Sequence, residues 1–339
     1  MILARTLLSK LRPARPTRRE LQEQYDASRV ALLTAVFRET RAGGAPDRAA
    51  LEQEVSTLDP AQRRKRTQAE LNKQVVAYFR LVQESREESQ AAVRRRAART
   101  QQDDFHSVLP GATSGSDPDP AEEELRRAVR EELGFCPSVR PSTIPGAGLG
   151  LFVDGTALEG AVVALYPGLV HLPENLIRDE YVAALLPDPD FFLMARADGT
   201  VVDGRTAEIL PSSPLAVAHM ANHPPPGGGR QGHRRRRRGG NVLQAAYDYP
   251  AAGASGSGGG LFFPEELRRF LPNRYHLPPR LLGGKVDRSA LVETVALVAT
   301  RDLRDEEVLM NYRFNPKLPA PSWYVPVDPG EAEERWAVE

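Results

Sequence analysis

The chain has 339 residues, of which 41% are hydrophobic, enough to bury one large core and an accessory region. Its 45 basic residues balance 45 acidic ones, so no overall charge draws the molecule to nucleic acid or to a membrane surface. The single cysteine, Cys136, excludes an intrachain disulfide and a cysteine-rich zinc cluster. No apolar stretch approaches the roughly 18 residues that a membrane-spanning helix requires.

The first nineteen residues carry basic side chains and no acidic one, and Leu3, Leu7 and Leu11 repeat every four residues. This pattern resembles a mitochondrial or plastid presequence. The alternative is a basic, frayed terminus without a role. Localisation therefore stays open between an organelle and the nucleus or cytoplasm.

Apolar residues recur with a helical period from Arg18 to about Ala42, and Gly43 and Gly44 end the run. The expected buried stripe of this helix is Leu21, Tyr25, Leu32, Leu33, Val36 and Phe37. A shorter helix is expected from Asp47, and a long charged one over 61–99 with the stripe Leu71, Val75, Tyr78, Phe79 and Val82. We expect this helical region, 1–106, to pack on itself or against the rest of the chain.

Residues 107–119 are rich in Pro, Gly, Ser and Asp, which predicts a linker and a domain boundary. Asp119 then suits an N-cap, Pro120 the first position of a helix, and Gly134 its end. We expect the main domain to span 120–314, followed by a C-terminal tail, 315–339.

Beyond Arg140 the pattern changes to short β-type runs, at 151–153, 161–166, 191–195, 200–203 and 291–299. Asp198-Gly199 predicts a hairpin turn. Helical patterns remain at 174–186 and 264–271. Two low-complexity stretches, 224–240 and 251–260, predict disordered insertions. The expected class is α+β, with a mostly β domain after an N-terminal helical region.

The string IPGAGLGLF places Gly146, Gly148 and Gly150 directly before Leu151 and Phe152. Alternate glycines let the backbone approach a ligand closely. A dinucleotide-binding loop is disfavoured, because it needs a following helix and a third glycine one position later. For this string alone, a purely structural glycine turn remains an alternative.

Three further strings follow in order: Tyr166-Pro167-Gly168, Asn222-His223, and RDLRDEEVLMNY over 301–312. Together with the glycines they resemble the SET family of protein-lysine methyltransferases. In that family a G-x-G-[LV]-F segment opens the domain, an Asn-His pair sits at a threaded pseudoknot, and a segment beginning R-D closes it with an essential tyrosine. The resemblance implies small curved sheets, S-adenosyl-L-methionine (S-adenosylmethionine) as cofactor, and methyl transfer to a lysine of a protein substrate. We expect a monomer.

The resemblance also assigns residues. Backbone at Gly148, Leu149 and Gly150 would cradle S-adenosylmethionine, and Asn222 and His223 would hold its amino-acid and adenine ends. The remaining assignments are Asn241 as the second asparagine of the motif, Tyr312 as catalytic and cofactor-contacting tyrosine, and Tyr166 and Phe314 beside the lysine channel, with Trp323-Tyr324 as a further candidate wall.

The chain departs from the family pattern in three places. Pro224 to Pro226 follow the Asn-His pair where small residues and a cysteine are common, and the gap to Asn241 is long. The glycine expected near Asp305 is missing. The cysteines of a post-SET zinc site are absent, so the channel wall must come from other residues.

The sequence also offers alternatives to this function. His219 and His223 have i, i+4 spacing, with His171 and His233 also present, but no zincin-type Glu and no cysteine partners accompany them, so no metal is expected. A non-catalytic SET module that binds a protein partner through the N-terminal helices stays open. So does a nucleic-acid binder using Arg234 to Arg238, although we interpret that run as a tolerated insertion.

Overall fold

The computed structural model describes residues 18–100, 120–176, 192–211, 213–226, 239–251, 262–277 and 290–337. The presequence-like terminus, the predicted linker and most of the two predicted insertions lie outside these residues. Within them, no helix combines the length and the apolar character needed to cross a membrane.

The predicted N-terminal helices are confirmed as α2 (Arg18–Arg41), α3 (Arg48–Thr57), α4 (Pro60–Thr100) and α5 (Pro120–Leu133). Asp47 caps α3 by accepting from the Ala50 N–H at 3.1 Å. Gly43 and Gly134 follow α2 and α5 with φ of 81° and 85°, as C-terminal stops should. The α4 stripe is fully buried. The prediction for Tyr25 is wrong: its side chain is 64% exposed, because α2 turns that face away from the core.

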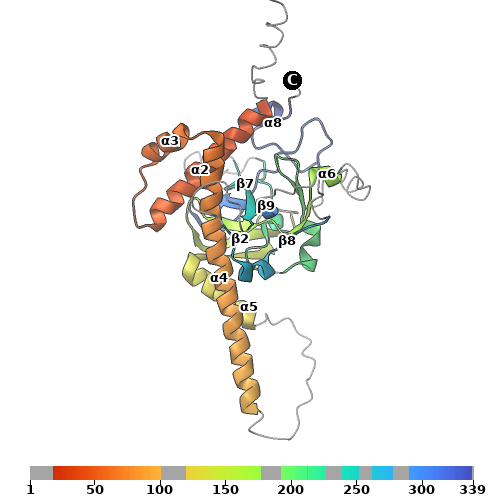
Figure 1. The fold of residues 1–339 in the computed structure, drawn as a ribbon. Coiled ribbons are helices and arrows are strands. Elements are labelled where there is room, and N and C mark those ends of the chain that lie inside the picture. The colour runs from red at the N-terminus through yellow and green to blue at the C-terminus, as the bar shows by residue number, and fades with distance from the viewer. Residues whose placement is uncertain are drawn as a thin grey trace, which may run out of the picture.

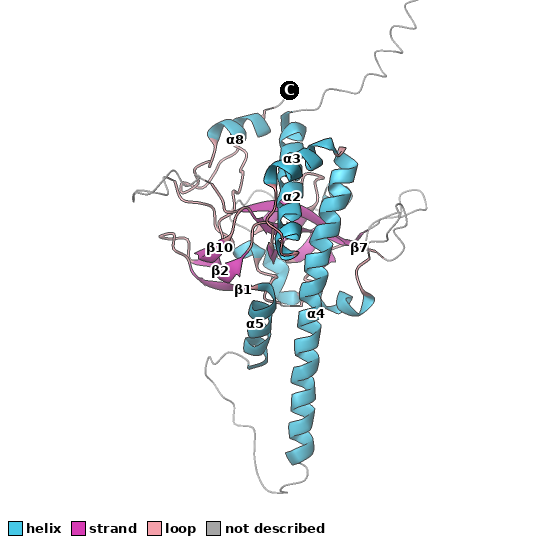
Figure 2. Cartoon of the chain, turned by 90° about the vertical axis from the view of Figure 1, so that its left-hand side faces the viewer, coloured by secondary structure: helices cyan, strands magenta, loops and turns pink. Residues whose placement is uncertain are grey.

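The strands form three small sheets, drawn in magenta at the centre of Figure 2. The first sheet has the order β1 (Phe135–Pro141), β2 (Leu149–Ala157), β10 (Leu303–Glu307). The second has the order β3 (Val162–Leu165), β9 (Ala290–Ala299), β7 (Val242–Pro250). The third has the order β5 (Leu193–Ala195), β6 (Val201–Asp203), β4 (Gly168–His171), β8 (Asn273–Tyr275). Only the β4–β8 pair is parallel among these named strands.

The predicted β-type runs fall on β2, β3, β5, β6 and β9, and the Asp198-Gly199 turn joins β5 to β6. The sequence pattern does not predict five strands: β1, β4, β7, β8 and β10. Strand β7 lacks a clean alternation because it is buried along most of its length, and β10 is mostly charged. The short helices are α6 (Pro173–Leu176), η1 (Gly204–Ile209), η2 (Ala218–Met220), η3 (Glu265–Phe270) and α8 (Pro329–Arg335). The pattern at 264–271 is thus a 3₁₀ helix, and the α+β class is confirmed.

Helix α4 runs the length of the body in Figure 1 and closes both edges of the β3-β9-β7 sheet. The Gln68 amide donates to the Ala246 carbonyl at 2.6 Å and accepts from the Asp248 N–H at 3.0 Å, on β7. Gln74 makes the same pair of bonds with the backbone entering β3, at 3.2 and 2.8 Å. Unpaired strand edges are thereby covered. Helices α2 and α4 share one hydrophobic core with the sheets. The boundary at 107–119, between the helical region and the main domain, stays a prediction.

Candidate active site

Three segments far apart in the sequence meet beside the first sheet: the start of β2, the Asn222-His223 pair, and residues 307–312. The Met310 N–H donates to the Asn222 carbonyl at 2.8 Å, and the Asn241 N–H donates to the Leu309 carbonyl at 2.9 Å. Residues 308–311 therefore run between the two ends of the 222–241 stretch. This is the arrangement expected of a threaded segment.

The Glu307 carboxylate, at the end of β10, joins these segments. Its Oε1 accepts from Ser142 Oγ at 2.6 Å and from Asn222 Nδ2 at 3.1 Å. Its Oε2 accepts from the Thr143 N–H at 2.8 Å and from the Thr143 hydroxyl. Burial alone would raise the pKa of Glu307, but these hydrogen bonds outweigh it and lower the pKa below its usual range. Nothing in the sequence pattern singles out Glu307, although it lies in the closing string.

The glycines of the opening string serve two purposes. A Cβ at Gly150 would lie 2.4 Å from Glu307 Oε1 and 3.0 Å from Asn222 Nδ2, so Gly150 leaves room for that hydrogen bond. Gly148 has a φ of 71°, and apart from its two chain neighbours no described residue has an atom within 4 Å of where its Cβ would be. A side chain there would be strained by the backbone, while the space beside it is open. Leu149 between them is half-exposed.

The Asn222 side-chain nitrogen is hydrogen-bonded within the protein, whereas the side-chain oxygen is available to a ligand. Its amide nitrogen donates to the Leu149 carbonyl at 3.0 Å and to Glu307 at 3.1 Å, which sets the orientation of the amide. Its Oδ1 accepts no hydrogen bond from the described residues. Asn222 thus offers one acceptor to a ligand.

The His223 ring has no nitrogen left for a ligand. Its Nδ1 accepts from the Tyr312 N–H at 3.2 Å, so its Nε2–H donates to the Val325 carbonyl at 2.8 Å. Burial lowers the pKa of His223, against a smaller opposing effect of backbone hydrogen bonds. The backbone N–H and C=O of His223 bond to none of the described residues. Any cofactor contact of His223 must therefore use its backbone or the face of its ring.

Asn241 braces the threaded segment. Its Nδ2 donates to the Glu307 carbonyl at 2.8 Å and its Oδ1 accepts from the Leu309 N–H at 2.7 Å. Its backbone N–H and C=O are also bonded, to Leu309 and Thr300. As placed, Asn241 shapes the site rather than presenting a polar group to it, and its direct cofactor contact stays a prediction.

Tyr312 stands in an aromatic cluster. Its hydroxyl donates to the Ala221 carbonyl at 3.0 Å, and burial raises its pKa to about 12, so the phenol is protonated at neutral pH. Its ring centroid lies 5.6 Å from that of Phe314 and 6.0 Å from that of Trp323, and Phe314 lies 4.7 Å from Tyr324. The structure therefore brings Phe314 together with the Trp323-Tyr324 pair. We call Phe314, Trp323 and Tyr324 the aromatic wall.

Tyr166 follows β3 and is buried. Its carbonyl accepts from Asn273 Nδ2 at 2.9 Å and from Thr294 Oγ1 at 2.8 Å. Burial raises the pKa of Tyr166, and the neighbouring Tyr312 raises it further. The place of Tyr166 beside a lysine channel stays a prediction.

His219 packs edge-on against Tyr166 and Phe192, with ring centroids 6.3 and 5.5 Å away. Burial lowers its pKa to about 4, so the imidazole is neutral at neutral pH. The structure pairs His171 with His276 at 4.8 Å between ring centroids, and His233 lies outside the described residues. Across the described ranges, no three His, Cys, Asp or Glu side chains are grouped as metal ligands would be.

Asp305 occupies the turn where the family pattern expects a glycine. Its φ is 44°, in the left-handed region that Asp tolerates better than most residues. Its carboxylate accepts from the Gly155 N–H at 2.8 Å, which supports the turn. The missing glycine therefore leaves the backbone path of the closing segment intact.

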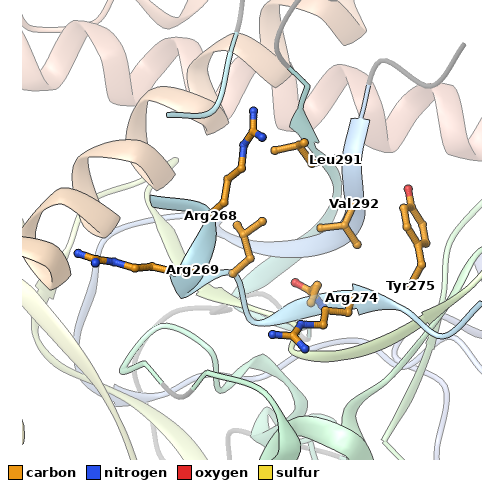
Figure 3. A pocket seen from close by; sticks show the side chains of 8 residues that line it. Arg268, Arg269, Arg274, Tyr275, Leu291 and Val292 are labelled. Atoms are coloured by element: carbon orange, nitrogen blue, oxygen red, sulfur yellow. The ribbon is translucent and has the colours of Figure 1, made fainter. Parts of the chain in front are cut away.

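A cavity of about 240 Å³ lies apart from this site, among η3, β8 and β9. Figure 3 shows that the side chains of Arg268, Arg269 and Arg274 along it extend in different directions, so they do not converge on one point. Its link to the site is Asn273, which lines the cavity and donates to the Tyr166 carbonyl.

Comparison with known proteins gives distant similarity. No protein-family model matches the chain, and no curated protein matches it. The solved structure of CpSET8 from Cryptosporidium is similar at 12% sequence identity and a TM-score of 0.28, covering 60% of this chain and 68% of that one. At this TM-score no residue role is transferred, so the site rests on the contacts described above.

Proposed function

We propose that the protein is an S-adenosylmethionine-dependent protein-lysine N-methyltransferase of the SET type. The observation that supports it most is the meeting of the opening glycines, the Asn-His pair and the closing tyrosine around a threaded segment. Within the family, the strings EELGF, DGTVVDG, PLAV and FPEELRRFLPN resemble SET domain-containing protein nine. The proposed substrate is a protein lysine, and the proposed acting species is a monomer.

The residues present suit this cofactor. When bound, S-adenosylmethionine supplies a methyl group activated by a sulfonium cation. Asn222 Oδ1 is the acceptor that an amino-acid ammonium needs, and the His223 backbone offers one donor and one acceptor for an adenine edge. The open space beside Gly148 lets a ligand approach the backbone.

Tyr312 orients the lysine amine in this proposal. Because its hydroxyl proton is already donated to Ala221, its oxygen lone pairs are left to accept from an amine N–H. With a pKa of about 12 the phenol is not ionised and does not act as a base. Its contribution is alignment of the amine with the methyl group, which is worth several kcal/mol when the reacting atoms lie about 3 to 3.5 Å apart.

The substrate must arrive as a neutral amine. With a reference pKa of about 10.4, this costs roughly 4.6 kcal/mol at pH 7. Buried Tyr166 and neutral His219 provide apolar, uncharged surroundings that disfavour an ammonium and so lower that cost. The cationic sulfonium of the cofactor acts in the same direction.

The test is methyl transfer by the full chain. The protein is incubated with S-adenosylmethionine carrying an isotopically labelled methyl group and a cell extract, and modified peptides are read by mass spectrometry. We expect label on lysine side chains. Cofactor binding without label on any protein would instead indicate the non-catalytic module, and label confined to arginine or to nucleic acid would contradict the lysine assignment.

A further inference from the structure

A network of four charged side chains links the N-terminal helix α2 and the C-terminal helix α8 to Arg313, the residue that follows Tyr312. The Asp26 carboxylate, on α2, accepts from both terminal nitrogens of Arg313, at 2.7 and 3.0 Å. It also accepts from Arg335 of α8 at 2.7 Å. Glu331 of α8 lies 3.3 Å from both arginines. We call Asp26, Arg313, Glu331 and Arg335 the clamp; Figure 1 shows α8 beside the first turns of α2.

The clamp is better shielded from water than an ordinary surface ion pair. The side chains of Asp26, Arg313 and Arg335 are 15%, 17% and 9% exposed. The bidentate geometry of Arg313 on Asp26 adds direction to the charge attraction. Asp26 is the shared partner, so its loss would leave two shielded guanidinium groups facing each other across Glu331 alone.

Arg313 holds an unusual backbone conformation at a place where it matters. Its φ is 54°, in the left-handed region that a long side chain seldom adopts. The Arg313 N–H donates to Asn311 Oδ1 at 3.1 Å, and its carbonyl accepts from Trp336 Nε1 at 3.2 Å. Such strain persists only where the surroundings enforce it. Because Arg313 lies between Tyr312 and Phe314, its conformation sets how those two rings stand toward each other.

We propose that Asp26 is a positioning residue for Tyr312, acting through Arg313, so that helix α2 is part of the active site. This rests on the proposed function only for its effect on turnover. The effect on the conformation around Tyr312 is independent of any reaction. Helix α2 then supports catalysis indirectly, through Arg313, in addition to covering the core.

The chain contains two tryptophans, and both report on this region. Trp323 lies 6.0 Å from Tyr312 by ring centroids, and the Trp336 indole N–H bonds to the Arg313 carbonyl. Intrinsic fluorescence therefore follows the clamp without a label. Glu159 offers a matched control, because its ion pair with Arg48 at 2.8 Å also joins the N-terminal helices to the body but does not involve the clamp.

The experiment compares full-length Asp26→Asn, Asp26→Glu and Glu159→Gln with the parent. We expect Asp26→Asn to shift tryptophan emission and to slow single-turnover methyl transfer by about 10- to 100-fold, with S-adenosylmethionine affinity unchanged within about twofold. Asp26→Glu should recover part of both signals, and Glu159→Gln should alter neither.

The proposal is overturned if Asp26→Asn changes only the melting temperature, or if Glu159→Gln reproduces its emission shift and rate. If the parent itself transfers no methyl group, the proposed function fails. The clamp is then tested by tryptophan emission and by quenching of the two tryptophans with a soluble quencher. An unchanged emission and quenching profile in Asp26→Asn then overturns it, and a changed profile supports it.

Discussion

The Glu307→Gln substitution tests the framework of the site. Each carboxylate oxygen accepts from two donors, so replacing either oxygen by an NH₂ group turns two attractive contacts into donor-to-donor contacts. The Ser142 and Thr143 hydroxyls can rotate to relieve one contact, but the Thr143 backbone N–H is fixed, and a flip of the Asn222 amide would break its bond to the Leu149 carbonyl. At about 1.5 to 3 kcal/mol per hydrogen bond to a charged group, we expect a loss of about 3 kcal/mol and a melting temperature lowered by about 6 °C.

Glu306→Gln is the matched control for this change. Glu306 is the preceding residue, and its ion pair with Arg301 at 2.6 Å is between half-exposed side chains, so its loss should cost about 0 to 1 kcal/mol. Thermal melting of both variants, with calorimetric titration of S-adenosylmethionine, gives the comparison. Equal melting temperatures for the two variants, or a Glu307→Gln protein as stable as the parent, would refute the role assigned to Glu307.

Three further predictions concern ligand affinity, pH and the arginine-rich insertion. Asn222→Ala should weaken S-adenosylmethionine binding by about 1 to 3 kcal/mol in calorimetry, and unchanged affinity would show that the assignment is misplaced. Folding lowers the pKa of Glu307, so this group stabilises the protein above its unfolded pKa of about 4.3 and stops doing so as pH falls through the folded value. The melting-temperature gap between parent and Glu307→Gln should therefore close below about pH 4, and a gap that stays constant from pH 7 to pH 3 would contradict this. Replacing residues 228–239 by a short Gly-Ser link should leave melting temperature and cofactor affinity unchanged, because loop closure costs little and this composition buries little; a collapse of either would show the insertion to be structural.

Sequence patterns predicted those features that depend on residues close together in the chain. The buried stripe of α4 follows from its period, and the turn between β5 and β6 follows from Asp198-Gly199. The glutamines that close the sheet edges were not predicted, because Gln68 and Gln74 look like solvated helix positions until the strands they bind are placed beside them. Strand β10 was missed for the same reason, since its charged residues pair only within the folded chain.

For the candidate site, the sequence indicated which segments form it but not the contacts that their side chains make. The structure brings Tyr312, Asn222 and the opening glycines together, and their roles toward a cofactor stay predictions. What the side chains do there depends on partners remote in sequence: the His223 ring is used by Tyr312 and Val325, and Glu307 is held by the 142–143 turn. Asp26 and Arg313 lie near opposite ends of the chain, so no spacing pattern indicated their contact.

Tyr312→Phe tests the central claim most directly, because it removes only the hydroxyl and keeps the ring among its aromatic neighbours. Losing the bond to the Ala221 carbonyl should cost about 1 kcal/mol of stability, which a melting curve will register. In single-turnover methyl transfer at saturating cofactor and substrate, the account predicts a rate about 10² to 10³ lower than the parent's, with cofactor affinity retained, since a positioned polar group acts mainly in the transition state. A Phe variant that transfers methyl groups within about twofold of the parent rate would contradict it.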